Sequence, residues 1–404
     1  MKRCLLPLLL LLSVSGCGVK DAMTDMFSSS DDNAEPPAPL LEFRTRLNVI
    51  ELWSEGIGSG TDEQYLKLAP VVANQKLFIV DSDGDLKALD ATNGQKLWSA
   101  KLKTERDIDS GGFWSRNAST TITGGPGYGE NTVLVGTNEG DVVAYAAETG
   151  KQLWSAKVSS EVLSAPQKKD NIVVVRTIDG KMFGLEGNEG RRLWIYDRTV
   201  PTLSLRGTSA PVIVDDIIIA GFDGGRLAAL ELRTGRLLWE SQVATARGSS
   251  ELERMVDIDS EPIVIDGVIY VATYQGNVAA IHMESGRILW TKDISTHAGM
   301  SADDRYIYLT DDNSHIWAFD RYSGISMWSH EKLHARAVTA PAVIGDYIVV
   351  GDFEGYLHWM EKDTGHFVAR TQLSDERIIA APIVVGKILY AFCTDGELAA
   401  YTYR

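Results

Sequence analysis

The sequence has little cysteine and no excess of positive charge. Only Cys4, Cys17 and Cys393 occur in 404 residues, and the first two lie in a segment with the form of an export signal. If that signal is processed at Cys17, the folded part keeps Cys393 alone, which excludes an intramolecular disulfide. The formal charge at pH 7 is −16, so no nucleic-acid-binding surface built on clustered Lys and Arg is expected.

Long hydrophobic runs and helical periodicity are also missing. The apolar stretch from Leu5 to Leu12 is too short to cross a bilayer, which needs roughly 20 residues. No later segment is long and apolar enough to do so. We find no stretch of about 10 to 15 residues with a period of 3.6, which argues against helical repeats. Hydrophobic residues nevertheless make up 44% of the chain, which excludes global disorder.

Residues 1–16 are interpreted as the export signal. Lys2 and Arg3 precede the apolar stretch, and a run of small residues ends at Cys17. This arrangement resembles the bacterial lipobox, in which the Cys thiol is lipidated and the chain is cut before it. The resemblance implies a lipoprotein anchored through Cys17, and Gly18 favours the outer membrane over the inner one. The alternative is an ordinary signal peptide with a chance Cys.

Residues 17–45 are predicted to be the lipidated Cys and a flexible tether. The segment contains a Ser-Asp run and Pro36-Pro37-Ala38-Pro39, and it has few apolar residues. Such a composition supports a linker without a core of its own.

The remaining chain, residues 46–404, consists of one repeat. A block from Gly through a Thr/Ser-Gly pair to Leu-Trp recurs, as in Gly84 to Trp98, and a Pro stands 14 positions before most first glycines. Eight copies can be counted, and the last, from Gly396, stops before its Trp. Each unit contains four short segments rich in Val, Ile and Leu, separated by Gly and Asp. In the fourth unit the predicted strands are Pro211–Val214, Ile217–Gly221, Arg226–Leu232 and Arg236–Gln242.

Four-stranded units of this length predict an all-β, eight-bladed β-propeller. The last blade lacks its fourth strand, and Val49–Trp53 carries the Leu-Trp ending without a preceding block. We therefore expect the N-terminal strand to close the last blade and remove an open edge. The tryptophans of this register are expected to dock neighbouring blades, since a large indole buries much apolar area. They are Trp53, Trp98, Trp154, Trp194, Trp239, Trp290 and Trp328.

The repeat resembles the tryptophan-docking motif of quinoprotein propellers. Together with the lipobox and the chain length, it is similar to the BamB family, a lipoprotein subunit of the machinery that assembles β-barrels in the Gram-negative outer membrane. The resemblance covers essentially the whole chain. It implies a non-catalytic scaffold facing the periplasm and bound to the POTRA domains of BamA, and through BamA to the other Bam subunits. Unfolded outer-membrane proteins are a further candidate partner.

All length variation between units falls in the connections between blades, which should lie on one face. Loop length gathered on one face indicates a binding surface. The connections 195–210 and 240–261 flank the same blade and should be neighbours. Their Leu-x-Leu-Arg and Asp-x-Asp segments match the family's BamA-binding motifs, which implies partner contacts at Leu203, Leu205, Arg206, Asp257 and Asp259. The acidic pair could contact the partner or hold Arg206, and the insertion 99–125 has no assigned role.

The alternative function is that of a membrane-anchored dehydrogenase dependent on pyrroloquinoline quinone. Those enzymes resemble this chain in the repeat, but many carry adjacent cysteines beside the cofactor, whereas Cys393 stands alone. The acidic run from Asp81 begins like a calcium loop but has Thr92 at the twelfth position, so a blade turn is expected. His330 and His334 have no third ligand in view. We therefore expect no catalytic residues, no metal site and no cofactor.

Overall fold

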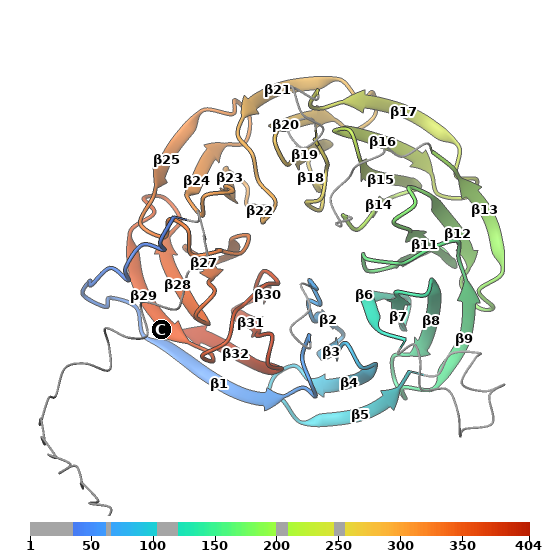
Figure 1. Cartoon of the computed structure of the whole chain (residues 1–404), viewed down its shortest axis with the longest axis horizontal. Coiled ribbons are helices and arrows are strands. Elements are labelled where there is room, and N and C mark those ends of the chain that lie inside the picture. Colours follow the sequence, from blue (N-terminus) through green and yellow to red (C-terminus); the bar gives the residue numbers. More distant parts are fainter. Residues whose placement is uncertain (1–34, 62–65, 103–119, 199–208, 246–254) are drawn as a thin grey trace, which may run out of the picture. The chain divides into compact units, whose positions relative to one another are not determined.

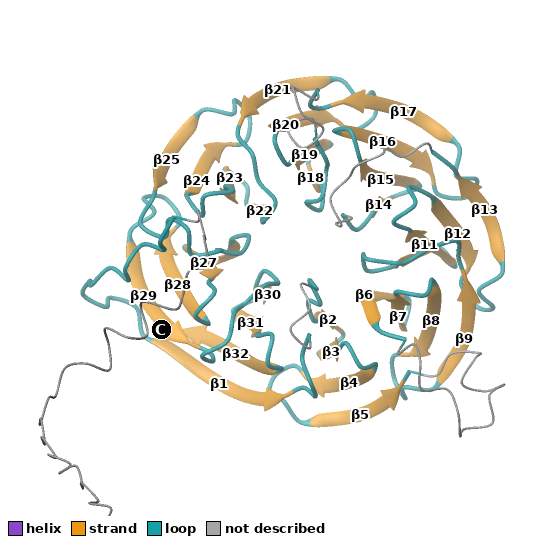
Figure 2. Cartoon of the chain, in the orientation of Figure 1, coloured by secondary structure: helices purple, strands orange, loops and turns teal. Residues whose placement is uncertain are grey.

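The computed structural model describes residues 35–61, 66–102, 120–198, 209–245 and 255–404. These residues form eight four-stranded antiparallel sheets, arranged as the blades of a ring (Figures 1 and 2). The predicted eight-bladed propeller is confirmed. Within the described ranges, no helix is long and apolar enough to cross a membrane.

The innermost strand of each blade is short, except for β6, and nearly all side chains of the second strand are buried. The innermost strands are β2 (Val71–Ala73), β6 (Ile122–Gly129), β10 (Gln167–Lys169), β14 (Val212–Val214), β18 (Ile263–Ile265), β22 (Gly299–Ala302), β26 (Ala342–Ile344) and β30 (Ile383–Val385). The second strands are β3 (Lys76–Val80), β7 (Thr132–Thr137), β11 (Ile172–Arg176), β15 (Ile217–Phe222), β19 (Val268–Ala272), β23 (Tyr306–Thr310), β27 (Tyr347–Gly351) and β31 (Ile388–Phe392).

The two outer strands continue each blade to the circumference. The third strands are β4 (Asp85–Asp90), β8 (Asp141–Ala146), β12 (Met182–Glu186), β16 (Arg226–Glu231), β20 (Asn277–His282), β24 (Ile316–Asp320), β28 (Tyr356–Glu361) and β32 (Glu397–Tyr403). The outermost strands are β5 (Lys96–Lys101), β9 (Gln152–Lys157), β13 (Arg192–Tyr196), β17 (Leu237–Gln242), β21 (Ile288–Asp293), β25 (Ser326–His330), β29 (Phe367–Gln372) and β1 (Val49–Gly56). In the fourth blade, each observed boundary falls within one residue of its predicted position.

The hydrophobic core lies between blades rather than inside any one of them. Phe78 of β3 and Val133 of β7, for example, belong to one buried cluster although they come from the first and second blades. A sheet buries its two faces only when it is stacked on other layers, so a single blade has no core of its own.

The tryptophans provide the contact between successive blades. The Trp194 indole N–H donates to the Leu232 carbonyl of the next blade at 3.0 Å. A Cβ at Gly235, whose φ is +68°, would lie 2.4 Å from a carbon of the same indole. The Thr-Gly turn is therefore required by a left-handed backbone and by the ring packed on it. All seven tryptophans of the register make the same bond, at 2.9–3.2 Å.

The N-terminal strand closes the ring. β1 pairs antiparallel with β32, from Val49 opposite Tyr403 to Gly56 opposite Glu397. The eighth blade is therefore built from both ends of the propeller sequence, as predicted, and Trp53 reaches the Ala91 carbonyl of the first blade.

The segment before β1 differs from the expected tether. The prediction placed residues up to 45 in the flexible tether, whereas residues 38–47, the strap, lie against the seventh blade. The amide N–H groups of Arg46 and Leu47 both donate to the Val368 carbonyl, and Phe43 stacks on Phe367 at 5.5 Å. Apolar and aromatic side chains near the end of the segment thus give it a packed surface that its Pro-rich beginning lacks.

We predict that Trp53→Ala lowers the free energy of unfolding by roughly 3–5 kcal/mol, as expected for truncation of a buried Trp. Trp53 is 8% exposed, and its loss also removes a bond across the closure. The matched control is Leu52→Ala, because Leu52 is 42% exposed and its truncation should cost less than about 0.5 kcal/mol. Urea denaturation measures both values, and equal losses would contradict the closure role of the indole.

Candidate functional site

The connections between blades and the turns between second and third strands lie on one face of the ring, the connection face. A central channel of about 480 Å³ is lined by residues at the start of the innermost strands, so it is continuous with this face. Three of its lining residues are charged: Lys67, Asp259 and Glu261. The remaining lining side chains are mostly Ala, Pro and other small residues.

A buried arginine stands at the connection face beside the fourth blade. Arg176, at the end of β11, is 1% exposed. Its Nη1 donates to the Ser209 hydroxyl at 3.2 Å, and its Nη2 lies 3.5 Å from the Asp223 carboxylate. The guanidinium also lies over the Phe222 ring, 5.1 Å from its centroid. Arg176 therefore joins the third blade to the turn of the fourth blade and to the end of the preceding connection.

The end of the next connection is fixed beside this arginine. Val256 and Ile258 are buried in the core, and they alternate with Asp257 and Asp259. Asp257 is 2% exposed, and its Oδ1 accepts the Gly224 N–H at 3.1 Å. Its backbone forms an isolated β-bridge with Asp223. Asp257 thus holds the connection against the turn between β15 and β16.

Asp259 lines the channel, where burial disfavours the charged form of its carboxylate. Burial raises the pKa of Asp259 to about 6, and the Asp257 charge adds to the effect, while Arg176 and Lys67 oppose it. Among the described residues, its Oδ1 has no hydrogen-bond partner. Arg176 lies among three carboxylates, which all favour its charged form: Asp223, Asp257 and Asp259. These four residues form the acidic cluster.

The structure brings together the described ends of the two predicted connections. Ser209, from the connection before the fourth blade, shares Arg176 with the carboxylates that follow this blade. The predicted contact residues Leu203, Leu205 and Arg206 lie outside the described residues.

Arg176 was not predicted, although the repeat contains a pattern that points to it. Four positions before the first Gly of each block, the other seven units have Val80, Gly136, Gly221, Ala272, Thr310, Gly351 and Phe392. Arg176 is the one charged residue at this register. A charge that interrupts an otherwise uncharged position of a repeat indicates a specific partner nearby.

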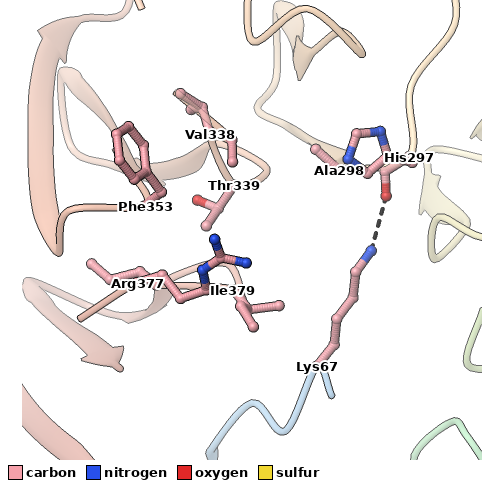
Figure 3. A pocket seen from close by; sticks show the side chains of 10 residues that line it. Lys67, His297, Ala298, Val338, Thr339, Phe353, Arg377 and Ile379 are labelled. Carbon is pink, nitrogen blue, oxygen red and sulfur yellow. Dashed lines mark hydrogen bonds between the residues drawn. The ribbon is translucent and has the colours of Figure 1, made fainter. Parts of the chain in front are cut away.

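A smaller pocket opens beside the channel, between the segment before β2 and the sixth to eighth blades (Figure 3). The Lys67 ammonium donates to the His297 carbonyl at 2.9 Å, and the Arg377 guanidinium points into the same space. Burial lowers the pKa of Lys67, and the Asp259 charge opposes this shift. Lys67 thus links this pocket electrostatically to the acidic cluster.

The other candidate sites have structural surroundings. Asp81 begins the turn between β3 and β4, and its Oδ1 accepts the Asp85 N–H at 2.7 Å. His330 lies 3.1 Å from the Met360 sulfur, whereas His334 pairs with a different histidine, His315. Within the described part of the chain, no group of three or more His, Cys, Asp or Glu side chains could hold a metal ion.

Comparison with known proteins decides the family. The family described as "Outer membrane protein assembly factor BamB" matches residues 51–112 and 82–330. An assembly factor BamB from Xanthomonas campestris is 35% identical over 400 residues, covering 99% of this chain and 97% of the relative. The chain belongs to the BamB family. A BamB from Pseudomonas aeruginosa is 38% identical over 397 residues, covering 98% of both chains.

Solved structures agree with this assignment. The crystal structure of BamB from Moraxella catarrhalis has a TM-score of 0.76 and 27% identity, covering 88% of this chain and 99% of that one. A quinohemoprotein alcohol dehydrogenase from Comamonas testosteroni has a TM-score of 0.66 but 14% identity, which shows a shared fold alone. As a BamB family member, the chain is an outer-membrane protein assembly factor.

We predict that Asp259→Asn flattens the pH dependence of stability. The folded-state pKa of Asp259, about 6, is above the usual aspartate pKa of 3.8, so the folded state binds more protons than the unfolded state between these two pH values. The wild-type free energy of unfolding should therefore fall as pH rises from about 4 to about 6. The variant should be more stable than wild type by up to about 3 kcal/mol near neutral pH, and no more stable near pH 4.

Denaturant unfolding across this pH range is the measurement. Asp170→Asn is the control, because the Asp170 side chain is 44% exposed and lies outside the cluster. Parallel pH profiles for wild type and Asp259→Asn would show that this carboxylate does not titrate in the window.

Proposed function

We propose that this chain is a non-catalytic scaffold lipoprotein that binds the periplasmic POTRA domains of BamA through its connection face. The observation that carries the proposal is the convergence of two long connections on Arg176. Ser209 and Asp223 contact this arginine directly, and Asp257 fixes the second connection to the same turn. Buried ionic and hydrogen-bonded contacts fix the described ends of both connections, and such pre-organisation lowers the entropic cost of binding.

The predicted site residues divide into three roles under this proposal. Leu203, Leu205 and Arg206 contact the partner, with two apolar side chains beside one cation. Asp257 braces the connections, since a side chain that is 2% exposed and bonded to Gly224 has little surface to offer a partner. Asp259 supplies negative potential at the channel, where it would attract a cationic side chain of this protein or of BamA.

The chain would carry out this role at the outer membrane, anchored through Cys17 and facing the periplasm. The strap is consistent with such an anchor because it fixes the start of the propeller to the seventh blade. Arg336 Nη1 donates to the Ala38 carbonyl at 3.1 Å, and Arg370 Nη2 donates to the Leu41 carbonyl at 3.0 Å.

We predict that Arg206→Glu abolishes co-purification with BamA. Truncating one member of a buried charged pair at an interface typically costs about 2–5 kcal/mol, and charge reversal should be no milder. Leu203→Ala with Leu205→Ala should weaken the same interaction through lost apolar contact. Pull-down from detergent-solubilised outer membrane measures binding, and thermal melting of the isolated variant reports on folding.

The matched control is Arg233→Glu in the turn between β16 and β17, on the opposite face of the fourth blade. The Arg233 side chain is 64% exposed, so its reversal should leave binding and melting unchanged. Normal co-purification of Arg206→Glu would remove Arg206 from the interface. Lost binding together with a collapsed melting temperature would assign Arg206 to bracing the loops instead.

A further prediction concerns the anchor. Cys17→Ser should abolish acyl labelling and release the chain from the outer-membrane fraction, because the thiol is the acyl acceptor. Cys4→Ser is the control, since Cys4 lies within the predicted signal and should leave labelling intact. Acyl labelling of Cys17→Ser at the wild-type level would exclude Cys17 as the anchor.

A further inference from the structure

A β-bulge recurs in the outermost strand of every blade. In β17, Trp239 pairs with Ala229 and Leu237 pairs with Leu230, so Leu238 has no partner on β16. The same irregularity occurs at the residue before each docking position. The eight bulged residues are Leu52, Leu97, Leu153, Leu193, Leu238, Leu289, Met327 and Val368. A bulge takes its residue out of the regular ladder. At Val368, the carbonyl of the bulged residue accepts hydrogen bonds from outside its blade.

Seven of these residues are 38–51% exposed, whereas Val368 is 2% exposed. The difference is the strap, which lies on the seventh blade. Its Arg46 and Leu47 amides donate to the Val368 carbonyl at 2.8 and 3.3 Å. Phe43 stacks on Phe367, the residue before the bulge. The chain thus shows how an extended segment occupies a bulged outer edge, through backbone bonds to the carbonyl and apolar contacts beside it.

Two further blades have the apolar pair that the strap covers on the seventh. Leu237 and Leu238 are 41% and 38% exposed, and Ile288 and Leu289 are 37% and 42% exposed. In the five remaining blades, the residue before the bulge is polar or charged: Glu51, Lys96, Gln152, Arg192 and Ser326. The two exposed pairs stand on successive outer strands, β17 and β21, which follow one another on the circumference in Figure 1.

We infer that the outer edges of β17 and β21 bind an extended segment of an unfolded outer-membrane β-barrel protein. This rests on the proposed function, which makes such proteins the clients of the machinery. Strands of outer-membrane barrels alternate apolar and polar residues, so one side of an extended client strand can cover Leu237 and Ile288. Backbone bonds to the bulge carbonyls need no particular sequence, which suits clients that differ from one another.

The position of the pairs separates them from the connection face. Leu237 and Ile288 begin their strands, directly after the turns between third and fourth strands, on the opposite face from the connections. A client at these edges and BamA at the connection face would therefore occupy different surfaces. The bulges also oppose edge-to-edge pairing between folded copies of the chain.

The test is binding of a fluorescent peptide copied from a transmembrane β-strand with alternating apolar residues, measured by anisotropy with the purified full chain. Leu237→Glu with Ile288→Glu should weaken binding at least about tenfold, because two buried carboxylates would replace the apolar contacts. The matched control is Lys96→Glu with Gln152→Glu, at the same register of the first two blades, which should bind as wild type does. Equal binding by both double variants, or no binding by the wild-type chain, would overturn the inference.

Two further measurements distinguish the proposed client from two other possible occupants of this surface. Co-purification with BamA should be normal for Leu237→Glu with Ile288→Glu, and its loss with unchanged melting would assign the surface to the assembly partner instead. Sedimentation should show the same monomer for wild type and variant, and a wild-type dimer abolished by the substitutions would assign it to a second copy of the chain. Failure of the proposed function would appear separately, as normal BamA binding by Arg206→Glu.

Discussion

The indole N–H of each docking tryptophan is bonded to a backbone carbonyl in the following blade, and the ring depends on this contact. Because the core lies between blades, a blade is stable only when its neighbour stands at a fixed distance and angle. The indole sets both, since it packs on a glycine that leaves no space for a Cβ. The constant spacing from Pro to Gly to Trp follows from this geometry, and the connections outside that frame are free to vary in length.

The seventh blade shows what replaces the indole where it is missing. Ala369 stands at the docking register there, and it shares a buried cluster with Leu47 of the strap and with Trp359 of β28. Leu47 is 5% exposed and Trp359 is fully buried. Apolar volume lost from the outer strand is thus supplied by the chain's own N-terminal segment and by a tryptophan one strand further in.

The sequence predicted the regular part of the fold well and the irregular part poorly. The blades, the closing strand and the register of the tryptophans follow from local turn chemistry and from a repeat. Because the same spacing recurs in successive units, the assignment of each unit supports that of the others. The bracing by Arg176 and the strap near Phe43 depend on single, non-repeating contacts between distant segments. Their geometry is fixed by tertiary packing, so a sequence pattern can mark an unusual residue without naming its partner. For the same reason, the pairing of Asp257 with Gly224 could not be told from a partner contact.

The closure of the ring has a consequence for the order of folding. Val49 pairs with Tyr403, so the eighth blade unites the first part of the propeller to be synthesised with the last. The intervening blades can form as the chain emerges, because their strand pairs are local. The eighth cannot, because β1 has no strand to pair with until β32 has been synthesised. Closure therefore waits for β32, and a chain truncated before β32 would remain an open arc.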